Sequence, residues 1–408
     1  MANNTKKTFL VSAALYLALM LFSAGCAKDQ TPPQVRFTSP TVPAGGTLLR
    51  KVKFAVEAYT NGDKSIARVE FSMDGVPLPH GMITSPPYEV QWEATDKFGL
   101  TRKVTATAYD NAGASASASI QVKFFNGVEK APMPTSRYAF TSNVVDNKIY
   151  VIGGFDFHFN LVEAYDPATD VWTTKTPSSS PHAAAAGCVI DGKIYVFGGG
   201  TNAEWVTDVE AYDPAADAWT KKAPIPFGSG ASIGMNTCAL AANGKAYLMG
   251  GLANPAPARV AEYDPVTDRW NVTNSSILEF GAAALNLNGL IYFIGGCEFR
   301  ALGICPSAID ALQSYDPATG AWTSHSPMIT PRADFCATSD NGKIYVMGGA
   351  AKSPTLPPDP HMEVYDPQTD KWTVLPDLPE GLANFGCNAV NGKIYIIGPK
   401  HVYEYSPD

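Results

Sequence analysis

Strand-like segments that are apolar on both faces recur through the last two thirds of the chain. Six segments share the form, and they are KIYVIGG (148–154), KIYVFGG (193–199), KAYLMGG (245–251), LIYFIGG (290–296), KIYVMGG (343–349) and KIYIIGP (393–399). Strands covered on both faces show this near-continuous apolar pattern. The pattern therefore predicts six copies of one β unit, each packed between neighbours.

A second repeated phrase, centred on Tyr-Asp-Pro, follows each of these segments. It reads VEAYDP at 162–167 and 209–214, VAEYDP at 260–265, LQSYDP at 312–317, MEVYDP at 362–367 and VYEYSP at 402–407. In five copies a tryptophan follows the tyrosine by seven residues, namely Trp172, Trp219, Trp270, Trp322 and Trp372. Proline and aspartate favour a turn. We expect the tryptophan to fill a buried structural position within each unit.

These phrases resemble the kelch signature over roughly 280 residues. The resemblance implies units of about four strands arranged as a β-propeller, which agrees with the repeat length. The predicted fold class is all-β, with a six-bladed kelch β-propeller over residues 125–408 preceded by a small immunoglobulin-like β-sandwich.

The sixth copy has no tryptophan strand. The segment QVKFFNGVEKAPMPTSR (121–137) resembles the sequence around a fourth strand in later copies, such as AWTKKAPIP (218–226). We therefore expect the segment near 122–131 to supply the outermost strand of the last blade. Such a closure would leave no open sheet edge in the ring.

Residues 34–124 have a different character. Short segments rich in Val, Phe, Tyr and Thr are separated by turn residues, at the spacing of a β-sandwich. The elements VEFSMDG (69–75), YEVQW (88–92) and TATAYDNAG (105–113) resemble a bacterial immunoglobulin-like domain. Such domains serve as spacers or adhesive units, and Trp92 is expected in the core.

The N-terminal residues resemble a lipoprotein signal. Lys6 and Lys7 precede an apolar run that is too short for an ordinary transmembrane helix, and small residues lead into Cys26. The resemblance implies a signal peptide over 1–25, a lipidated Cys26 and a tether over 26–33; a plain secretory signal is the alternative. We expect an envelope protein, held at the outer membrane on its periplasmic side or at the cell surface by the lipid alone.

Composition narrows the possible chemistry. The net charge of −8 argues against nucleic acid as a partner, because phosphate binding requires a basic face. No zinc or copper motif, nucleophile motif or phosphate-binding glycine loop is present, so no metal, cofactor or catalytic residue is predicted.

Seven cysteines fall into three groups. Cys26 is the lipidation candidate. Cys188, Cys238, Cys336 and Cys387 precede the tight turns of the repeats, where packing in the core is expected and a redox or metal role is the alternative. Cys297 and Cys305 flank a long loop, and outside the cytoplasm they could form a disulfide.

One set of charged residues recurs at the same position of the repeat. Ten residues before the second residue of each tight turn stand Arg137, His182, Gly234, Glu279, Arg332 and Leu382. These positions are expected to surround one mouth of the central channel. Arginines there could bind a carboxylate or an acidic sugar, whereas the alternative is that they bond strand-end carbonyls or solvent.

The loops after the paired glycines are expected on the same face. They carry the candidate contact residues Phe155, Phe157, His158, Glu204, Trp205, Arg259, Phe299 and Arg300, together with the proline-rich stretch 353–360. Exposed aromatic residues near arginine could stack on sugars or anchor a protein partner. Trp205 could instead pack on its own blade.

Three functions remain open. The first is a lipid-anchored extracytoplasmic scaffold that binds a protein or glycan through the propeller mouth and loops. The second is an enzyme acting on acidic sugars, similar to the periplasmic kelch N-acetylneuraminate epimerase, with Arg137, His182, Glu279 and Arg332 as its residues. The third is an architectural envelope protein. Since fold alone does not determine function, the site has to decide among them.

Overall fold

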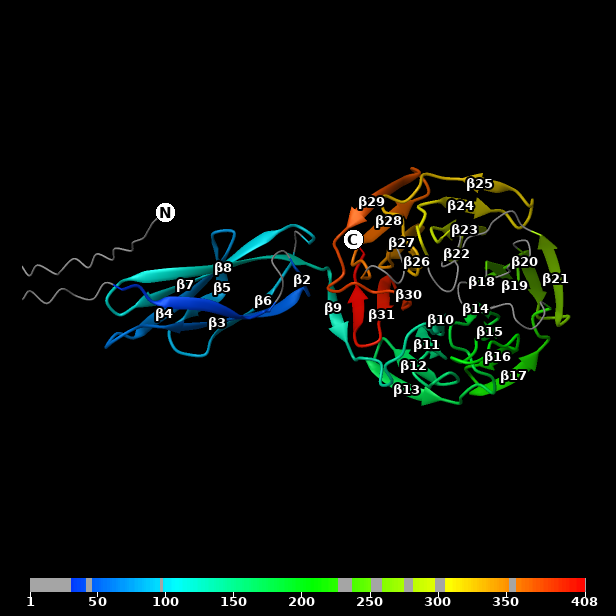
Figure 1. Ribbon diagram of the computed structural model, residues 1–408, viewed down its shortest axis with the longest axis horizontal. Coiled ribbons are helices and arrows are strands. Elements are labelled where there is room, and N and C mark those ends of the chain that lie inside the picture. The colour runs from blue at the N-terminus through cyan, green and yellow to red at the C-terminus, as the bar shows by residue number, and fades with distance from the viewer. Residues whose placement is uncertain are drawn as a thin grey trace, which may run out of the picture.

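The structure is a computed structural model of the chain, and it describes residues 31–41, 46–95, 98–226, 237–250, 259–274, 282–297, 305–351 and 357–407. Within these ranges the regular elements are all β-strands. None of the described residues forms a helix long and apolar enough to cross a membrane. The strands build a small sandwich and a ring of sheets beside it (Figure 1).

The sandwich consists of two packed sheets. One has the order β1-β3-β6, and the other has the order β2-β8-β7-β4-β5. Their bounds are β1 Gln34–Ser39, β2 Gly46–Leu48, β3 Lys51–Tyr59, β4 Ile66–Met73, β5 Val76–Ile83, β6 Tyr88–Glu93, β7 Arg102–Asp110 and β8 Ser115–Phe124. Alternate residues of these strands point inward. Trp92 packs against this core, with its ring 4.9 Å from that of Phe124.

Six four-stranded antiparallel sheets form the blades of the ring (Figure 1). Blades 1 to 3 comprise β10 Thr141–Val145, β11 Lys148–Ile152, β12 Val162–Asp166, β13 Val171–Lys175; β14 Ala186–Ile190, β15 Lys193–Phe197, β16 Val209–Asp213, β17 Ala218–Lys222; and β18 Thr237–Ala242, β19 Lys245–Gly250, β20 Arg259–Asp264, β21 Arg269–Asn274.

Blades 4 to 6 complete the ring. They comprise β22 Ala283–Leu287, β23 Leu290–Ile294, β24 Leu312–Tyr315, β25 Trp322–Ser324; β26 Cys336–Asp340, β27 Lys343–Met347, β28 Met362–Asp366, β29 Lys371–Leu375; and β30 Gly386–Val390, β31 Lys393–Ile397, β32 Val402–Tyr405 with β9 Gly127–Lys130. The first strand of each blade lies nearest the centre of the ring (Figure 1).

The repeated apolar strands are the second strands of the blades, and both of their faces are buried. In β11 every residue after Lys148 is buried. Ile149 and Val151 pack against blade 6, whereas Tyr150 and Ile152 pack against blade 2. A strand between two neighbours can bury both faces, which explains why the sequence is apolar at consecutive positions.

Strand β9 closes the ring. It pairs antiparallel with β32, with Val128 opposite Glu404 and Lys130 opposite Val402. Gly127–Lys130 lies inside the range 122–131 that the sequence indicates for this role. The closing strand therefore comes from the N-terminal side of the propeller, and the last blade combines both ends of the repeat region.

The same segment fixes the sandwich to the ring. Phe125 follows β8 directly, is fully buried, and stacks on Tyr405 of blade 6 at 5.4 Å. Lys123 Nζ lies 3.3 Å from the Asp377 carboxylate. The backbone N–H of Arg50 donates to Gly127 O at 3.2 Å. Covalent continuity, ring packing and polar contacts all act across this junction.

The repeated tryptophan joins neighbouring blades. The Trp172 indole N–H donates to the carbonyl of Ala131, just beyond the outer strand of the preceding blade, at 2.9 Å. Asp170 accepts the N–H of Ala131 and the hydroxyl of Tyr165. We call this arrangement the Tyr–Asp–Trp contact. It recurs with Tyr212, Asp217 and Trp219, with Tyr263, Asp268 and Trp270, and with Tyr365, Asp370 and Trp372.

The expectation of a buried tryptophan needs correction. Trp172 and its equivalents in blades 2, 3 and 5 are half-buried, while the tyrosines beneath them are fully buried. In blade 4 the aspartate position is Gly320, and Trp322 is 39% exposed. The tryptophan covers the tyrosine from outside because its indole N–H has to reach the neighbouring blade.

Candidate functional site at the propeller mouth

Arg137 is the first of the predicted mouth residues, and it points into its own blade. Its side chain is fully buried and forms an ion pair with Glu163 of β12. Nε donates to Gly153 O at 2.7 Å, Nη1 to Thr135 O at 3.0 Å and Nη2 to Val151 O at 3.2 Å. Burial lowers the pKa of the guanidinium, and Glu163 opposes that shift. The guanidinium is therefore held by groups of its own blade.

Arg332 repeats the arrangement in blade 5. Its Nη2 lies 2.5 Å from Glu363 Oε1, and Nη1 donates to Gly348 O at 3.0 Å and to His361 O at 2.8 Å. The Glu363 carboxylate also accepts the backbone N–H groups of Ile329 and Thr330. The carboxylate thus fixes the segment that leads into the first strand of the blade.

His182 occupies the same position in blade 2. Nδ1 lies 2.7 Å from Gly198 O and Nε2 lies 3.1 Å from Glu210 Oε2, and the ring is fully buried. Both partner oxygens are acceptors, so the ring satisfies both only when each nitrogen carries a proton. His182 thus occupies the place of the arginine of blades 1 and 5, between the carbonyl that follows the second strand and the glutamate of the third.

The environment of Glu210 favours its ionised form. Burial raises its pKa, but hydrogen bonds from His182, from the hydroxyl of Ser179 and from the backbone N–H of Ser180 outweigh burial and lower the pKa to about 2. A carboxylate that accepts several hydrogen bonds is stabilised in its charged state. Glu210 is therefore a carboxylate at neutral pH and a firm partner for His182.

These contacts correct the prediction of an anion-binding ring. Ligand binding was one interpretation of these residues, and bonding of the arginines to strand-end carbonyls was the other; Arg137 and Arg332 do bond the carbonyls of Gly153 and Gly348. Arg137, His182 and Arg332 each also form a buried pair with a glutamate of the third strand, a feature we call the blade ion pair. The sequence carries a signal for it, because glutamate occurs at this third-strand position in the three blades with Arg or His. Blade 6 has Leu382 and Tyr403 at the two positions instead.

Backbone bonds connect the blades where their inner strands begin. Two residues beyond each blade ion-pair position the chain has a left-handed conformation, with φ of 52° at Ala139, 54° at Ala184, 59° at Asp334 and 54° at Asn384. The N–H of Ala184 donates to Ala139 O at 2.7 Å, and the N–H of Ala139 donates to Asn384 O at 2.9 Å. These bonds connect successive blades at the entry of their inner strands.

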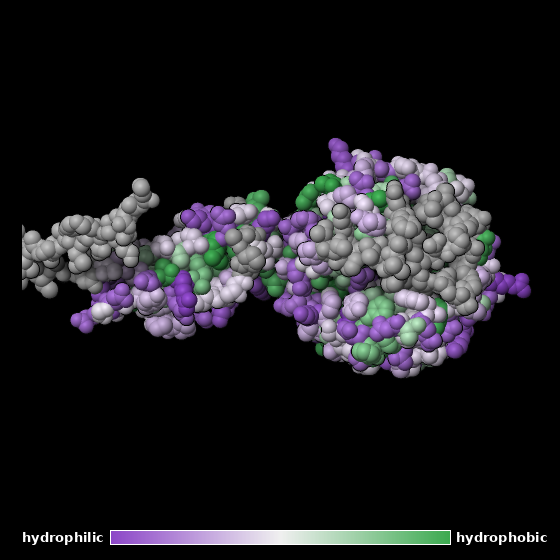
Figure 2. All heavy atoms as spheres, in the orientation of Figure 1, coloured by the Kyte–Doolittle hydropathy of each residue, from purple (hydrophilic) through white to green (hydrophobic). Residues whose placement is uncertain are grey.

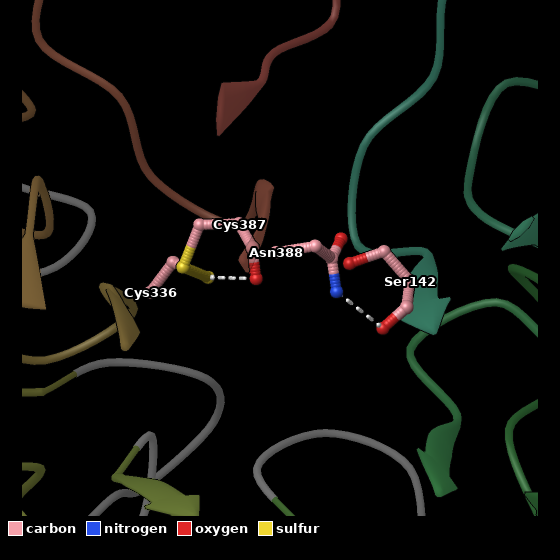
Figure 3. Close-up of a disulfide and its surroundings, with 4 residues drawn as sticks. All are labelled: Ser142, Cys336, Cys387 and Asn388. Carbon is pink, nitrogen blue, oxygen red and sulfur yellow. Dashed lines mark hydrogen bonds between the residues drawn. A yellow bond between two sulfur atoms is a disulfide. The ribbon is translucent and has the colours of Figure 1, made fainter. Parts of the chain in front are cut away.

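A disulfide joins the inner strands of blades 5 and 6. Cys336 begins β26, Cys387 is the second residue of β30, and their Cα atoms are 5.9 Å apart (Figure 3). Beside it the amide of Asn388 reaches the carbonyl of Ser142 in blade 1 at 3.3 Å (Figure 3). Core packing was expected for Cys336 and Cys387, and both do pack in the core between blades 5 and 6; the disulfide between them was not predicted. The first position of one inner strand faces the second position of the next, which brings the two thiols together.

Cys297 and Cys305 form a second disulfide, with 6.0 Å between their Cα atoms. Both are fully buried. Cys188 is a free thiol on the inner strand β14, and burial raises its pKa to about 12. A thiol buried in this way stays protonated and unreactive, so Cys188 acts as a core side chain. The Sγ of Cys238 on β18 lies 2.8 Å from Ala282 O.

The loop candidates differ in exposure. Phe155 is half-buried, and Phe157 and His158 are exposed. In the next blade Glu204 is exposed, while Trp205 is half-buried and forms a backbone bridge with Gly200. On the face seen in Figure 2, apolar side chains gather over blades 1 and 2. Phe157 and His158 are therefore the exposed aromatic candidates of their loop, whereas Arg137 and Arg332 lie inside their blades.

Some predicted residues lie outside the described part of the chain. They are Cys26, Gly234, Glu279, Phe299, Arg300, residues 353–356 and the side chain of Arg259. Among the described residues, no group of three or more His, Cys, Asp or Glu side chains is placed to hold a metal ion.

The four-stranded sheets with their Tyr-Asp-Pro turns define a kelch-type β-propeller. Residues 149–399 match the family described as Attractin/LZTR1 beta-propeller, and the chain belongs to that family. Residues 33–122 match the bacterial Ig domain. The prediction of a propeller preceded by an immunoglobulin-like domain is confirmed.

Curated relatives share only part of their length with this chain. Kelch-like protein 23 of Homo sapiens is 30% identical over 208 residues, which cover 49% of this chain and 36% of that protein. Beta-scruin of Limulus polyphemus is 36% identical over 102 residues, covering 24% and 11%. The solved structure titled "Structure of YjhT" aligns with a TM-score of 0.56 at 21% identity, over 66% of this chain and 94% of that chain. At this identity the structural likeness concerns the fold.

Proposed function

We propose that this protein is an extracytoplasmic scaffold that binds another protein. Lipidated Cys26 would hold it at the cell envelope, and the sandwich would carry the propeller away from the membrane. The observation that carries this proposal is the junction at Phe125. One segment, Ser115–Lys130, contributes a strand to the sandwich and a strand to the last blade, so the propeller is attached at one end of the sandwich (Figure 1). A sandwich attached in this way can hold the propeller at a distance from the membrane, where a partner protein can bind it.

Two further observations support it. The disulfides Cys297–Cys305 and Cys336–Cys387 favour a compartment outside the reducing cytoplasm. Kelch-type propellers commonly bind protein partners, an argument by analogy with the family. The hypothesis of an enzyme acting on acidic sugars is not supported by its candidate residues. Arg137, His182 and Arg332 all contact glutamates within their own blades.

The test has two arms. Cells expressing the full chain or Cys26→Ser are fractionated after feeding with a clickable fatty acid; the wild type should be labelled and membrane-bound, and the variant unlabelled and soluble. In the second arm, the wild-type protein is extracted in mild detergent, and its intact complexes are separated by mass under native conditions. We expect the chain in a complex with a second protein. Unlabelled wild-type protein would reject the tether, and a chain found only at its own mass would reject the scaffold.

A further inference from the structure

The loop between β11 and β12 carries an aromatic cluster on the mouth face. The ring of Phe155 lies 5.5 Å from that of Tyr138 and 6.3 Å from that of Phe159, and the Phe157 ring lies 6.5 Å from that of Phe159. Phe157 is 84% exposed, more than any other aromatic side chain in the described part of the chain. Three rings thus form a base on which a fourth projects into solvent.

The backbone of this loop holds Phe157 outward. Asp156 has a φ of 93° and Phe157 a φ of 64°, conformations that are unfavourable for a residue with a bulky side chain. Such strain persists where surrounding contacts impose it, and it gathers at binding sites. An exposed phenylalanine in a strained backbone has no role in the core, because its ring contributes little to packing there.

The base of the loop is well anchored. Gly153 N–H donates to Leu161 O at 2.9 Å, Phe155 N–H donates to Tyr138 O at 2.9 Å, and the N–H of His182 in blade 2 donates to Phe159 O at 2.7 Å. His182 is itself held by its blade ion pair with Glu210. The projecting ring is therefore preorganised, and preorganisation reduces the entropy lost on binding.

We infer that this aromatic loop, residues 155–159, inserts Phe157 into an apolar pocket of a partner protein whose rim is basic. A benzyl ring offers no hydrogen bond to sugar hydroxyls, and the rings of Phe157 and Phe159 meet at 62°, so they form a wedge in place of a flat stacking platform. Exposed Asp156 has no ion-pair or hydrogen-bond partner among the described residues, and the chain carries a net charge of −8. Charge complementarity therefore favours a basic rim, and it disfavours a second copy of this acidic chain.

The inference rests on the proposed scaffold function and is tested on the full chain in its own cells. A photoreactive benzophenone amino acid replaces Phe157 in one variant and Val266 in the other. Val266 is the matched control, because it is 89% exposed but lies in the Tyr-Asp-Pro turn of blade 3. Irradiation should join a discrete second protein to position 157 and not to position 266. The adduct identifies the protein used in the next step.

That protein is purified, and its affinity for the mature wild-type chain, Phe157→Ala, Asp156→Lys and Val266→Ala is measured by calorimetry, beside a melting curve for each. We expect at least a tenfold loss for Phe157→Ala, a weaker and less salt-dependent complex for Asp156→Lys, and no change for Val266→Ala. All should melt as the wild type does. Affinities within twofold of wild type for both loop variants would overturn the inference, as would an adduct with only a second copy, or binding of a glycan alone. A complex that forms without Phe157 would leave the scaffold function standing and reject this surface.

Discussion

Glu363 Oε1 lies 2.5 Å from Nη2 of Arg332, and both side chains are almost completely buried between the start of blade 5 and its third strand. The pair is the centre of a network that also includes the carbonyls of Gly348 and His361 and the N–H groups of Ile329 and Thr330. These contacts join the start of blade 5 to the ends of its second and third strands, so the pair organises the blade.

Removing the cation should destabilise the fold. Arg332→Ala leaves the Glu363 carboxylate buried without its counter-charge, and we expect a loss of roughly 3–5 kcal/mol in the free energy of unfolding. Urea denaturation followed by tryptophan fluorescence measures it. Lys343→Ala is the control, because its contact with Asp366 in the same blade is exposed and should contribute less than about 1 kcal/mol.

The propeller also supplies a rescue for this variant. Blade 6 has Leu382 and Tyr403 at the two positions of the blade ion pair, and both are buried there. The double variant Arg332→Leu, Glu363→Tyr should therefore recover part of the stability lost in Arg332→Ala, since no unpaired charge remains. Recovery stays incomplete because the N–H groups of Ile329 and Thr330 lose their acceptor. If Arg332→Ala were as stable as the wild type, the buried ion pair would not contribute to stability as argued.

Repetition explains what the sequence could predict. The repeated apolar strands, the Tyr-Asp-Pro turns and the missing sixth tryptophan predict the strands and the closing role of the segment near 122–131. The direction of Arg137 could not be predicted from its position alone, because a residue at the start of an inner strand can turn to the channel or back into its blade. Comparing the copies with one another would have indicated the pairing with Glu163.

The disulfide between blades and the loop that carries Phe157 could not be predicted from the sequence. The first depends on the register between blades, and the second lies in a loop that differs from copy to copy. Cys336 is the first residue of β26 and Cys387 the second of β30, so they stand one position apart in the repeat, and the sequence does not show which positions of adjacent inner strands face each other. The loop that exposes Phe157 has no counterpart of equal length in blade 6, where Gly398 and His401 close a short turn. Loops vary between copies, so their conformation follows from local contacts.

Gly320 interrupts the Tyr–Asp–Trp contact in blade 4, and restoring the aspartate should stabilise the propeller. Gly320 has a φ of 76°, close to the 57° of Asp170 and the 51° of Asp370, and nothing lies within 4 Å of an added Cβ. Gly320→Asp should gain a hydrogen bond from Tyr315 and raise the free energy of unfolding by about 0.5–1.5 kcal/mol. Gly320→Ala, which adds strain without an acceptor, should not stabilise. An aspartate variant no better than the alanine variant would refute the restored contact.

The two disulfides should differ in their effect on stability. In the chain-entropy model a crosslink stabilises more when it closes a longer loop, and the separations are 51 residues for Cys336–Cys387 and 8 for Cys297–Cys305. That model gives about 4 kcal/mol for the first and about 2.5 kcal/mol for the second. Melting curves of Cys336→Ser with Cys387→Ser, and of Cys297→Ser with Cys305→Ser, test the order. The interblade pair should cause the larger decrease in melting temperature, and the reverse order would contradict this assignment.

Acid should weaken the contact between Glu210 and His182 in blade 2, because it protonates the carboxylate. Glu210 has an ordinary carboxyl pKa of 4.5 when unfolded and a pKa lowered to about 2 in the folded chain. A group whose folded pKa is depressed contributes stability that is fully present above its unfolded pKa and is lost as the pH falls through the folded value. The wild type should therefore lose stability between about pH 4.5 and 2 more steeply than Glu210→Gln, which cannot ionise there. Urea midpoints measured in steps from pH 6 downward give the two slopes. Glu204→Gln, at an exposed glutamate of the same blade, is the control and should follow the wild type. Parallel curves for wild type and Glu210→Gln would show that this carboxylate does not contribute to folding through its charge.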